Sequence, residues 1–136
     1  MNLNKVFLIG RLVKEVDFRI APTGNQIAVL NIATNRNYRD RNNQEVNETE
    51  FHRVIAWGKL AEICKNYLTK GRLIFVEGRI HYRNWLTPDG QKKFITEIIA
   101  ENVTFGPKTI EEETTEEFKD FETNIDQEGN IWDIQF

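Results

Sequence analysis

Three segments in the first half of the chain have the apolar pattern of β-strands. Residues 3–13, 25–35 and 50–57 are rich in β-branched and aliphatic side chains. The sequence Ala-Pro-Thr-Gly-Asn at 21–25 is a turn signal between the first two segments. The polar residues 36–48 have no apolar period, so we interpret them as a long loop before the third strand.

The hydrophobic period changes at residues 59–71, and the new period predicts a helix. Apolar side chains recur there at spacings of three and four residues, as on one face of an amphipathic helix. These side chains are Leu60, Ile63, Cys64, Tyr67 and Leu68. Gly71 is the expected stop, because glycine tolerates the left-handed backbone that ends many helices.

Two further strands follow the helix and form a predicted hairpin. Residues 72–85 and 91–105 favour strand, and Thr-Pro-Asp-Gly at 87–90 is a turn sequence. The predicted order is three strands, one helix and two strands. This order is typical of an all-β OB-fold, a five-stranded barrel with one α-helix between strands 3 and 4. An SH3-like barrel is the alternative, but a helix of three turns at this place favours the OB-fold.

Two of the predicted strands carry aromatic residues and arginines on one face. Strand side chains alternate between faces, so every second residue shares a face. Arginine is rarely buried unless it is paired, and we therefore expect both faces to be exposed. The faces are formed by Phe51, Arg53, Ile55 and Trp57 on the third strand, and by Arg79, His81, Arg83 and Trp85 on the fourth.

Exposed aromatic rings beside arginines suit a single strand of nucleic acid. Bases of any sequence stack on aromatic rings, and the phosphates need cations at intervals. The segment 36–41 repeats this mixture, with Tyr38 between Arg36, Arg39 and Arg41. Any one of these aromatic residues alone is better explained as a core or subunit contact. The hypothesis depends on three segments that show the same mixture.

The charge of the chain is unevenly distributed, although its net value is only −3. Residues 1–106 carry 16 Lys and Arg against 11 Asp and Glu, a balance of +5 that favours a polyanionic partner. Residues 107–136 carry 2 against 10, a balance of −8, and this acidic tail is expected to compete for the same surface. The single cysteine excludes an internal disulfide, and no segment approaches the ~20 apolar residues of a membrane span. We therefore expect a soluble, cytoplasmic protein.

Several segments resemble the bacterial single-stranded DNA-binding proteins. The most specific is ETEFHRVIAWGKLAE, and the full set is 4–12, 30–35, 48–62, 67–71 and 76–80. The resemblance implies that residues 1–106 are an OB-fold domain that assembles as a homotetramer and binds and protects single-stranded DNA without sequence preference. It also implies roles in DNA replication, recombination and repair, and a location at the bacterial nucleoid.

The resemblance assigns roles to individual residues. The implied base-stacking residues are Tyr38, Phe51, Trp57 and Trp85. The implied phosphate contacts are Arg53, Lys59, Lys70 and Arg83, to which the loop and strand patterns add Arg36 and Arg79. His52 matches a position near the subunit contacts of the family, although the sequence alone is better explained by a half-buried, hydrogen-bonded histidine. The family often has Trp at the positions of Tyr38 and Phe51 and Phe at that of Trp57, and these exchanges preserve stacking.

The acidic tail is predicted to be a disordered linker with an apolar tip. Residues 107–130 contain too few apolar side chains to offset the entropy of ordering them. Residues 131–136 resemble the family's partner-docking peptide, although Trp132 replaces an acid and Gln135 replaces a proline. The resemblance implies that genome-maintenance proteins bind this tip in an apolar pocket with a basic rim. The predicted contacts are Trp132, Asp133, Ile134 and Phe136. A purely solubilising tail is the alternative.

The sequence gives less support to other functional classes. The acids of the body show no paired spacing, His52 and His81 are not spaced as metal ligands, and the chain contains no serine. We therefore expect neither catalysis nor a metal or other cofactor. A primosomal OB-fold adaptor of replication restart is an alternative, although such modules lack an acidic tail with an apolar tip. An OB module for RNA or oligosaccharide is another, and RNA recognition would use the 2′-OH.

Overall fold

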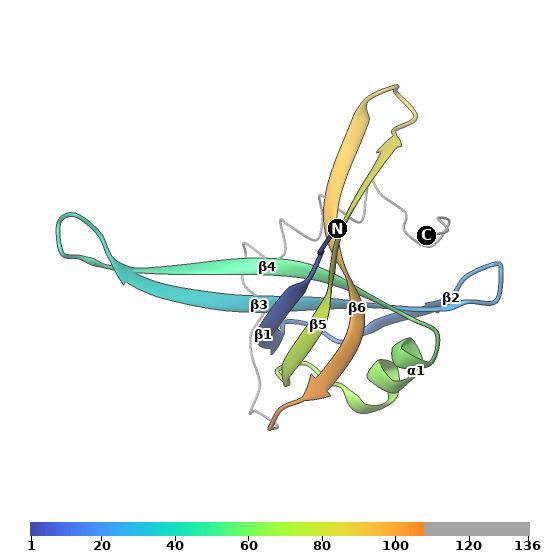
Figure 1. The fold of residues 1–136 in the computed structure, drawn as a ribbon, viewed down its shortest axis with the longest axis horizontal. Coiled ribbons are helices and arrows are strands. Elements are labelled where there is room, and N and C mark those ends of the chain that lie inside the picture. The colour runs from blue at the N-terminus through green and yellow to red at the C-terminus, as the bar shows by residue number, and fades with distance from the viewer. Residues whose placement is uncertain (108–136) are drawn as a thin grey trace.

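The computed structural model describes residues 1–107, which form a β-barrel with two projecting hairpins (Figure 1). The predicted linker beyond residue 107 and the predicted tip at 131–136 lie outside the described residues. The elements are β1 (Val6–Leu12), β2 (Asp17–Ile20), β3 (Gln26–Arg39), β4 (Glu45–Trp57), α1 (Gly58–Tyr67), β5 (Leu73–Leu86) and β6 (Lys92–Phe105).

Five strands close the barrel in the order β1-β5-β6-β4-β3, because β1 pairs with both β5 and β3. The helix α1 connects β4 to β5, which are the third and fourth strands of the barrel. The predicted OB-fold is therefore confirmed. The short strand β2 was not predicted. It pairs with β3 beside the barrel, and its four residues are too few to show a hydrophobic period.

Aliphatic side chains from the barrel strands and from α1 fill the interior. The buried set includes Leu12, Leu30, Ile32, Val54, Ala61, Cys64, Leu68, Ile74, Val76 and Ile98. Because strand side chains alternate, the neighbours of these residues point to the other side of the sheet. Ile55 and Ile99 meet Ile27 and Val29 there, in a second buried cluster. The β3–β4–β6 part of the barrel is therefore apolar on both sides.

The helix α1 is shorter than predicted. It ends at Tyr67, because Leu68 adopts an extended backbone while its N–H still donates to the carbonyl of Cys64. Gly71 has a positive φ of 90° and lies in the turn that leads into β5. Cys64 and Leu68 are buried as the helical period predicts, whereas Tyr67 is exposed and its ring lies 6.4 Å from that of Phe105.

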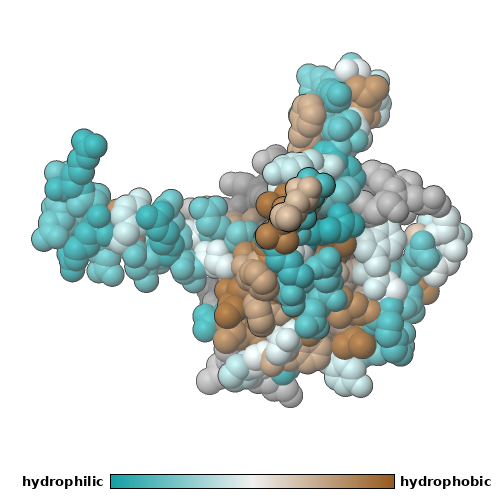
Figure 2. Space-filling view, viewed as in Figure 1, coloured by the Kyte–Doolittle hydropathy of each residue, from teal (hydrophilic) through white to brown (hydrophobic). Residues whose placement is uncertain are grey.

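The loop predicted for residues 36–48 is wrong, because most of it continues β3 and β4 as a long hairpin (Figure 1). Pairing continues as far as Arg39 opposite Glu45, and only residues 40–44 form the connection. Figure 2 shows that hydrophilic residues cover this hairpin. Both of its faces are solvated, so no apolar alternation marks its strands in the sequence.

The hairpin of β5 and β6 agrees with the prediction, including its turn. The N–H of Gly90 donates to the carbonyl of Thr87, and Gly90 has a positive φ of 91°. Residues 79–97 extend away from the barrel (Figure 1), and we term them the β5–β6 arm.

The body of the barrel has an exposed apolar surface over β1 and β5. Phe7 and Ile9 are 61% and 63% exposed, and Phe75 is 37% exposed. The rings of Phe7 and Phe75 stack with their centroids 6.3 Å apart. Hydrophobic residues gather over this part of the body in Figure 2. We term this surface, formed by Phe7, Ile9 and Phe75, the β1–β5 surface.

Candidate nucleic-acid interface

One surface of the sheet runs across β4, β6 and β5 and contains most of the predicted stacking and phosphate contacts. The pairing registers place Ile55 beside Ile99, and His81 opposite Glu97, on neighbouring strands. The predicted faces of the third and fourth barrel strands therefore join into one surface. We term it the β4–β6–β5 face, formed by Phe51, Arg53, Trp57, Arg79, His81, Arg83, Trp85 and Glu97.

The expectation that Arg53 and Arg83 are exposed is wrong. Each side chain is only 5% exposed, because each guanidinium is paired with the fully buried carboxylate of Glu97. Nε of Arg53 donates to Oε2 of Glu97 at 3.2 Å, and Nε and Nη2 of Arg83 donate to its two oxygens, also at 3.2 Å. We therefore regard these arginines as the buried base of the face and do not retain them as direct phosphate contacts.

The Glu97 cluster leaves an excess of positive charge beneath the face. Two guanidinium groups share one carboxylate, so the three side chains together carry a charge of +1. Nη1 of Arg83 is buried and has no acceptor among the described residues. A buried donor without an acceptor is unfavourable, and an anion bound nearby would relieve that cost.

Three of the predicted stacking residues lie on this face and are partly exposed: Phe51, Trp57 and Trp85. Trp57 packs against the second apolar cluster, which is formed by Ile27, Val29, Ile55 and Ile99. The guanidinium carbon of Arg83 lies 5.0 Å from the centre of the Trp85 ring. Protein atoms therefore hold these rings while part of each remains accessible to a base.

The fourth predicted stacking residue, Tyr38, lies on the long hairpin and away from this face. Alternation along β3 and β4 places Tyr38 and Arg36 on the side of the ribbon opposite to Phe51. The guanidinium carbon of Arg36 lies 4.7 Å from the centre of the Tyr38 ring, and Arg36 also pairs with Glu48 at 3.4 Å. The structure therefore separates this aromatic–cation pair from the other predicted stacking residues.

The remaining predicted phosphate contacts are cations at the surface. Lys59 has a side chain that is 78% exposed, and its Nζ lies 3.7 Å from Glu62, one helical turn away. Lys70 is half-buried and follows α1, and Arg79 is half-buried at the base of the β5–β6 arm. An exposed pair such as Lys59 with Glu62 is weak in water, so its ammonium stays available to an anion.

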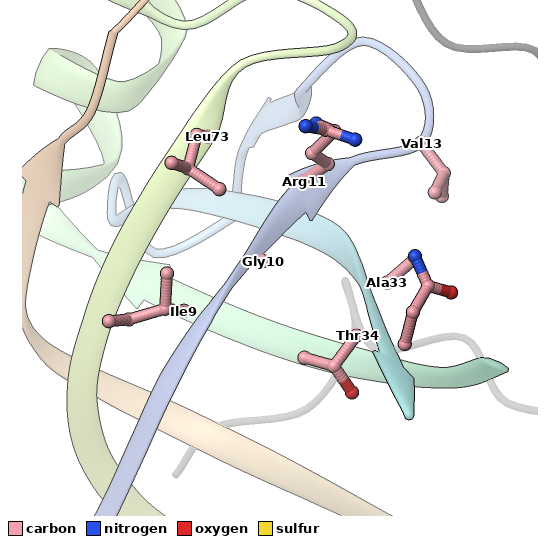
Figure 3. Close-up of a pocket in the computed structure, with 8 residues that line it drawn as sticks. Ile9, Gly10, Arg11, Val13, Ala33, Thr34 and Leu73 are labelled. Carbon is pink, nitrogen blue, oxygen red and sulfur yellow. The ribbon is translucent and has the colours of Figure 1, made fainter. Parts of the chain in front are cut away.

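His52 lies on the reverse side of β4, next to an open pocket. Its Nε2 is 2.9 Å from the hydroxyl of Thr34, and burial lowers its pKa while the charge of Glu50 acts to raise it. Thr34 lines the pocket with residues of β1 and β5 that include Ile9 of the β1–β5 surface and Leu73 (Figure 3). Pocket and surface are therefore continuous, and a subunit contact at His52 stays a prediction.

Glu97 is a component of the site that the sequence analysis missed. It occupies an apolar position in the alternation of β6, between Ile95 and Ile99. A carboxylate at such a position must be paired if the strand is buried. An acid at an apolar position of a strand therefore predicts a buried ion pair. In this chain that pairing accounts for the burial of Arg53 and Arg83.

The described residues show few features of a reactive thiol, a metal site or a membrane span. Burial raises the pKa of the Cys64 thiol to about 11, so its reactive thiolate is suppressed. Residues 1–107 contain no group of three or more His, Cys, Asp or Glu placed to hold a metal ion. Within the same range no helix is long and apolar enough to cross a membrane. The predicted tip contacts Trp132, Asp133, Ile134 and Phe136 lie outside the described part of the chain.

Comparison with known sequences identifies relatives over the barrel domain. The model of the single-strand binding protein family matches residues 3–106. A single-stranded DNA-binding protein of Thermotoga maritima is 39% identical over 119 residues, which are 85% of this chain and 84% of that protein. Single-stranded DNA-binding protein 1 of Chlorobaculum tepidum is 41% identical over 99 residues, which are 72% of this chain but only 61% of that protein.

Solved structures with the same fold are also related in sequence. The Plasmodium falciparum SSB in complex with ssDNA has a TM-score of 0.74 and 37% identity, and the match covers 79% of this chain and 97% of that one. The wild-type single-stranded DNA binding protein of Thermus aquaticus has a TM-score of 0.67 and 42% identity. That match covers 77% of this chain and 50% of the Thermus chain.

Proposed function

The chain belongs to the single-strand binding protein family, and from this premise we propose that its β4–β6–β5 face binds single-stranded DNA without sequence preference. The proposal rests chiefly on one observation: Trp57 and Trp85 are partly exposed on one surface, above a buried cluster with excess positive charge. The complex of the related Plasmodium protein with ssDNA supports it.

The face would hold a DNA strand by stacking and by charge. Phe51, Trp57 and Trp85 offer ring surfaces to unpaired bases, and such stacking accepts any base because every base has a π-face. Arg79, at the edge of the face, would meet phosphates, and the excess charge of the Glu97 cluster adds a field of the same sign. Lys59, Lys70, Arg36 and Tyr38 would extend the contact along the DNA.

The wider roles of the protein are part of the same proposal. Binding would protect single-stranded DNA during replication, recombination and repair, and residues 131–136 would recruit partner proteins. Assembly as a homotetramer would bury the β1–β5 surface, because soluble monomers seldom expose stacked phenylalanines next to a pocket. Binding of single-stranded DNA is not an enzymatic function, so no catalytic residue is proposed.

The proposal is tested by tryptophan fluorescence of the full chain during titration with poly-dT at several salt concentrations. A Trp132→Phe background removes the signal of the tail and leaves Trp57 and Trp85 as reporters. Stacking should quench the fluorescence, and log affinity should fall linearly with log salt as counterions are released. Replacing Trp85 with Ala should weaken binding by ~1–3 kcal/mol, the usual contribution of one stacked base.

The matched control is Tyr67→Ala, which removes an exposed aromatic residue from α1 and not from the face. It should leave the affinity for poly-dT unchanged. Competition by oligo-U separates DNA from RNA recognition, because an RNA-binding module would prefer the 2′-OH. The proposed function would be wrong if poly-dT caused neither quenching nor salt-dependent binding, or if oligo-U displaced it at much lower concentration.

A further inference from the structure

The reverse side of the β5–β6 arm exposes three large apolar side chains that the barrel core and the β4–β6–β5 face do not use. Tyr82 is 73% exposed, Leu86 is 69% exposed and Phe94 is 71% exposed. They lie on the side opposite to Arg83 and Trp85, because strand side chains alternate. We term this surface the outer arm face, formed by Tyr82, Asn84, Leu86, Lys92, Phe94 and Thr96.

The stability of the arm does not account for these side chains. Its other side is already packed, with Arg83 at 6% and Ile95 at 9% exposure and with Trp85 half-buried. A hairpin with one packed side normally has polar residues on its solvated side. Asn84 and Thr96 follow that rule, whereas Tyr82 and Phe94 do not. Aromatic residues on a solvated side therefore point to a ligand.

The spacing of the three side chains suits a stack of bases. Tyr82 is opposite Thr96, Phe94 is opposite Asn84, and Leu86 is opposite Lys92. Tyr82, Phe94 and Leu86 therefore follow one another in steps of two residues, or ~7 Å at the usual rise of a strand. Stacked bases are ~3.4 Å apart along a strand, so each step has room for one base between neighbouring side chains.

The charge of the outer arm face favours nucleic acid over protein as the ligand. The ammonium of Lys92 lies 5.6 Å from the centre of the exposed Phe94 ring. The other side of the arm has the same combination, with Arg83 at 5.0 Å from the Trp85 ring. None of the six residues of the outer arm face is acidic. Lysine is depleted in protein–protein interfaces, whereas phosphates require cations next to the stacking rings.

We propose that the outer arm face is a second binding site for single-stranded DNA, separate from the β4–β6–β5 face. This inference rests on the proposed function of that face. DNA that contacts both sides passes around the arm, so each subunit covers more nucleotides than the β4–β6–β5 face alone can contact. A short oligonucleotide fills only the first site, and a long strand fills both.

The test compares short and long DNA on the full chain. The variant combines Tyr82→Thr, Leu86→Thr and Phe94→Thr, because threonine is polar and still favours strand. Binding of an oligo-dT of ~10 nucleotides, a length within the range of one OB-fold, should be unchanged. The affinity for poly-dT should fall about tenfold or more with the loss of stacking. The number of nucleotides covered per subunit at saturation should also fall.

Two further measurements address contact and charge directly. Ultraviolet crosslinking of poly-dT to the full chain should label Tyr82 or Phe94, as located by mass spectrometry. Lys92→Gln should lower the salt slope of poly-dT binding by about one, the contribution of a single phosphate contact. Ile20→Thr is the matched control, because Ile20 is 64% exposed on β2 and away from the arm. It should change neither the covered length nor the affinity.

Three results would overturn the inference. One is an unchanged covered length and poly-dT affinity in the triple variant. Another is a change only in the sedimentation of the DNA-free chain, which would make the outer arm face a contact between copies of the protein. The third is failure of the unaltered chain to bind either the short oligonucleotide or poly-dT, which would refute the proposed function itself and is distinguishable from the first two.

Discussion

Glu97 is a single carboxylate that serves two guanidinium groups from different strands. Arg53 comes from β4 and Arg83 from β5, and the carboxylate on β6 lies between them. The cluster therefore connects three strands beneath the β4–β6–β5 face by charge-assisted hydrogen bonds. Such bonds are about twice as strong as neutral ones, but removal of one partner leaves the others buried without compensation.

At this scale we predict that Glu97→Ala destabilises the protein by ~3–5 kcal/mol, because two buried cations lose their counterion. Urea unfolding followed by circular dichroism measures the change. Glu101→Ala is the matched control, since Glu101 also lies on β6 but pairs with Lys5 at the surface. Its effect should be much smaller, because exposed ion pairs contribute little. Equal losses in the two variants would show that the buried cluster has no special role.

At the scale of elements, β5 contributes both to the barrel and to the arm, and Gly78 lies where the two parts meet. The register of β5 against β6 shifts between Glu77 and Gly78, which is a β-bulge. A side chain at this position would meet backbone, because a Cβ on Gly78 would lie 2.2 Å from the carbonyl oxygen of Ile99. The close approach of the strands therefore requires glycine, and it lets the hairpin bend from the barrel into the arm.

We predict that Gly78→Ala lowers the free energy of unfolding by ~1–3 kcal/mol, as overpacking against backbone usually does. Thermal and urea unfolding measure the effect. Asn84→Ala, at an exposed position of the same strand, should stay within about 0.5 kcal/mol of the unaltered chain. A stable Gly78→Ala variant would mean that the strands can separate at the bulge without cost.

At the scale of the whole molecule, a basic domain is joined to an acidic segment. Residues 1–106 have a charge balance of +5 and residues 107–136 a balance of −8. Opposite charges on one chain attract at a distance when salt is low, and the attraction is screened beyond ~8–10 Å at physiological ionic strength. We therefore expect the acidic residues to compete with DNA phosphates for the same cations.

We predict that removal of residues 108–136 increases the affinity for poly-dT at low salt and that the increase disappears at high salt. A charge control keeps the full length and replaces Glu111, Glu112, Glu113, Glu116 and Glu117 with Gln. It should increase affinity in the same direction, because charge and not length is responsible. Tighter binding of the unaltered chain at low salt would contradict this view of the tail.

The sequence alone determined the order of the five barrel strands and the helix, the OB-fold and the turn of the β5–β6 arm. Each depends on local signals: the period of apolar residues, and glycine or proline at turns. The strand alternation also predicted which residues of β4 and β5 share the β4–β6–β5 face, although it did not identify Glu97 of β6. The resemblance of the segment 48–62 to a known family was likewise a local property, and the comparison over residues 3–106 confirmed the family.

The tertiary structure decided what depends on distant residues. Arg53 and Arg83 are buried because of Glu97, which is 44 and 14 residues away in the sequence, and no local pattern of β4 or β5 contains that information. Most of the polar stretch 36–48 is strand, because its first part ends β3, its last part begins β4, and the two pair with each other in solvent, where no apolar face is needed. The sequence alone did not predict that the rings of the outer arm face are exposed. Strand alternation defines two faces, and only tertiary packing determines which of the two faces is covered.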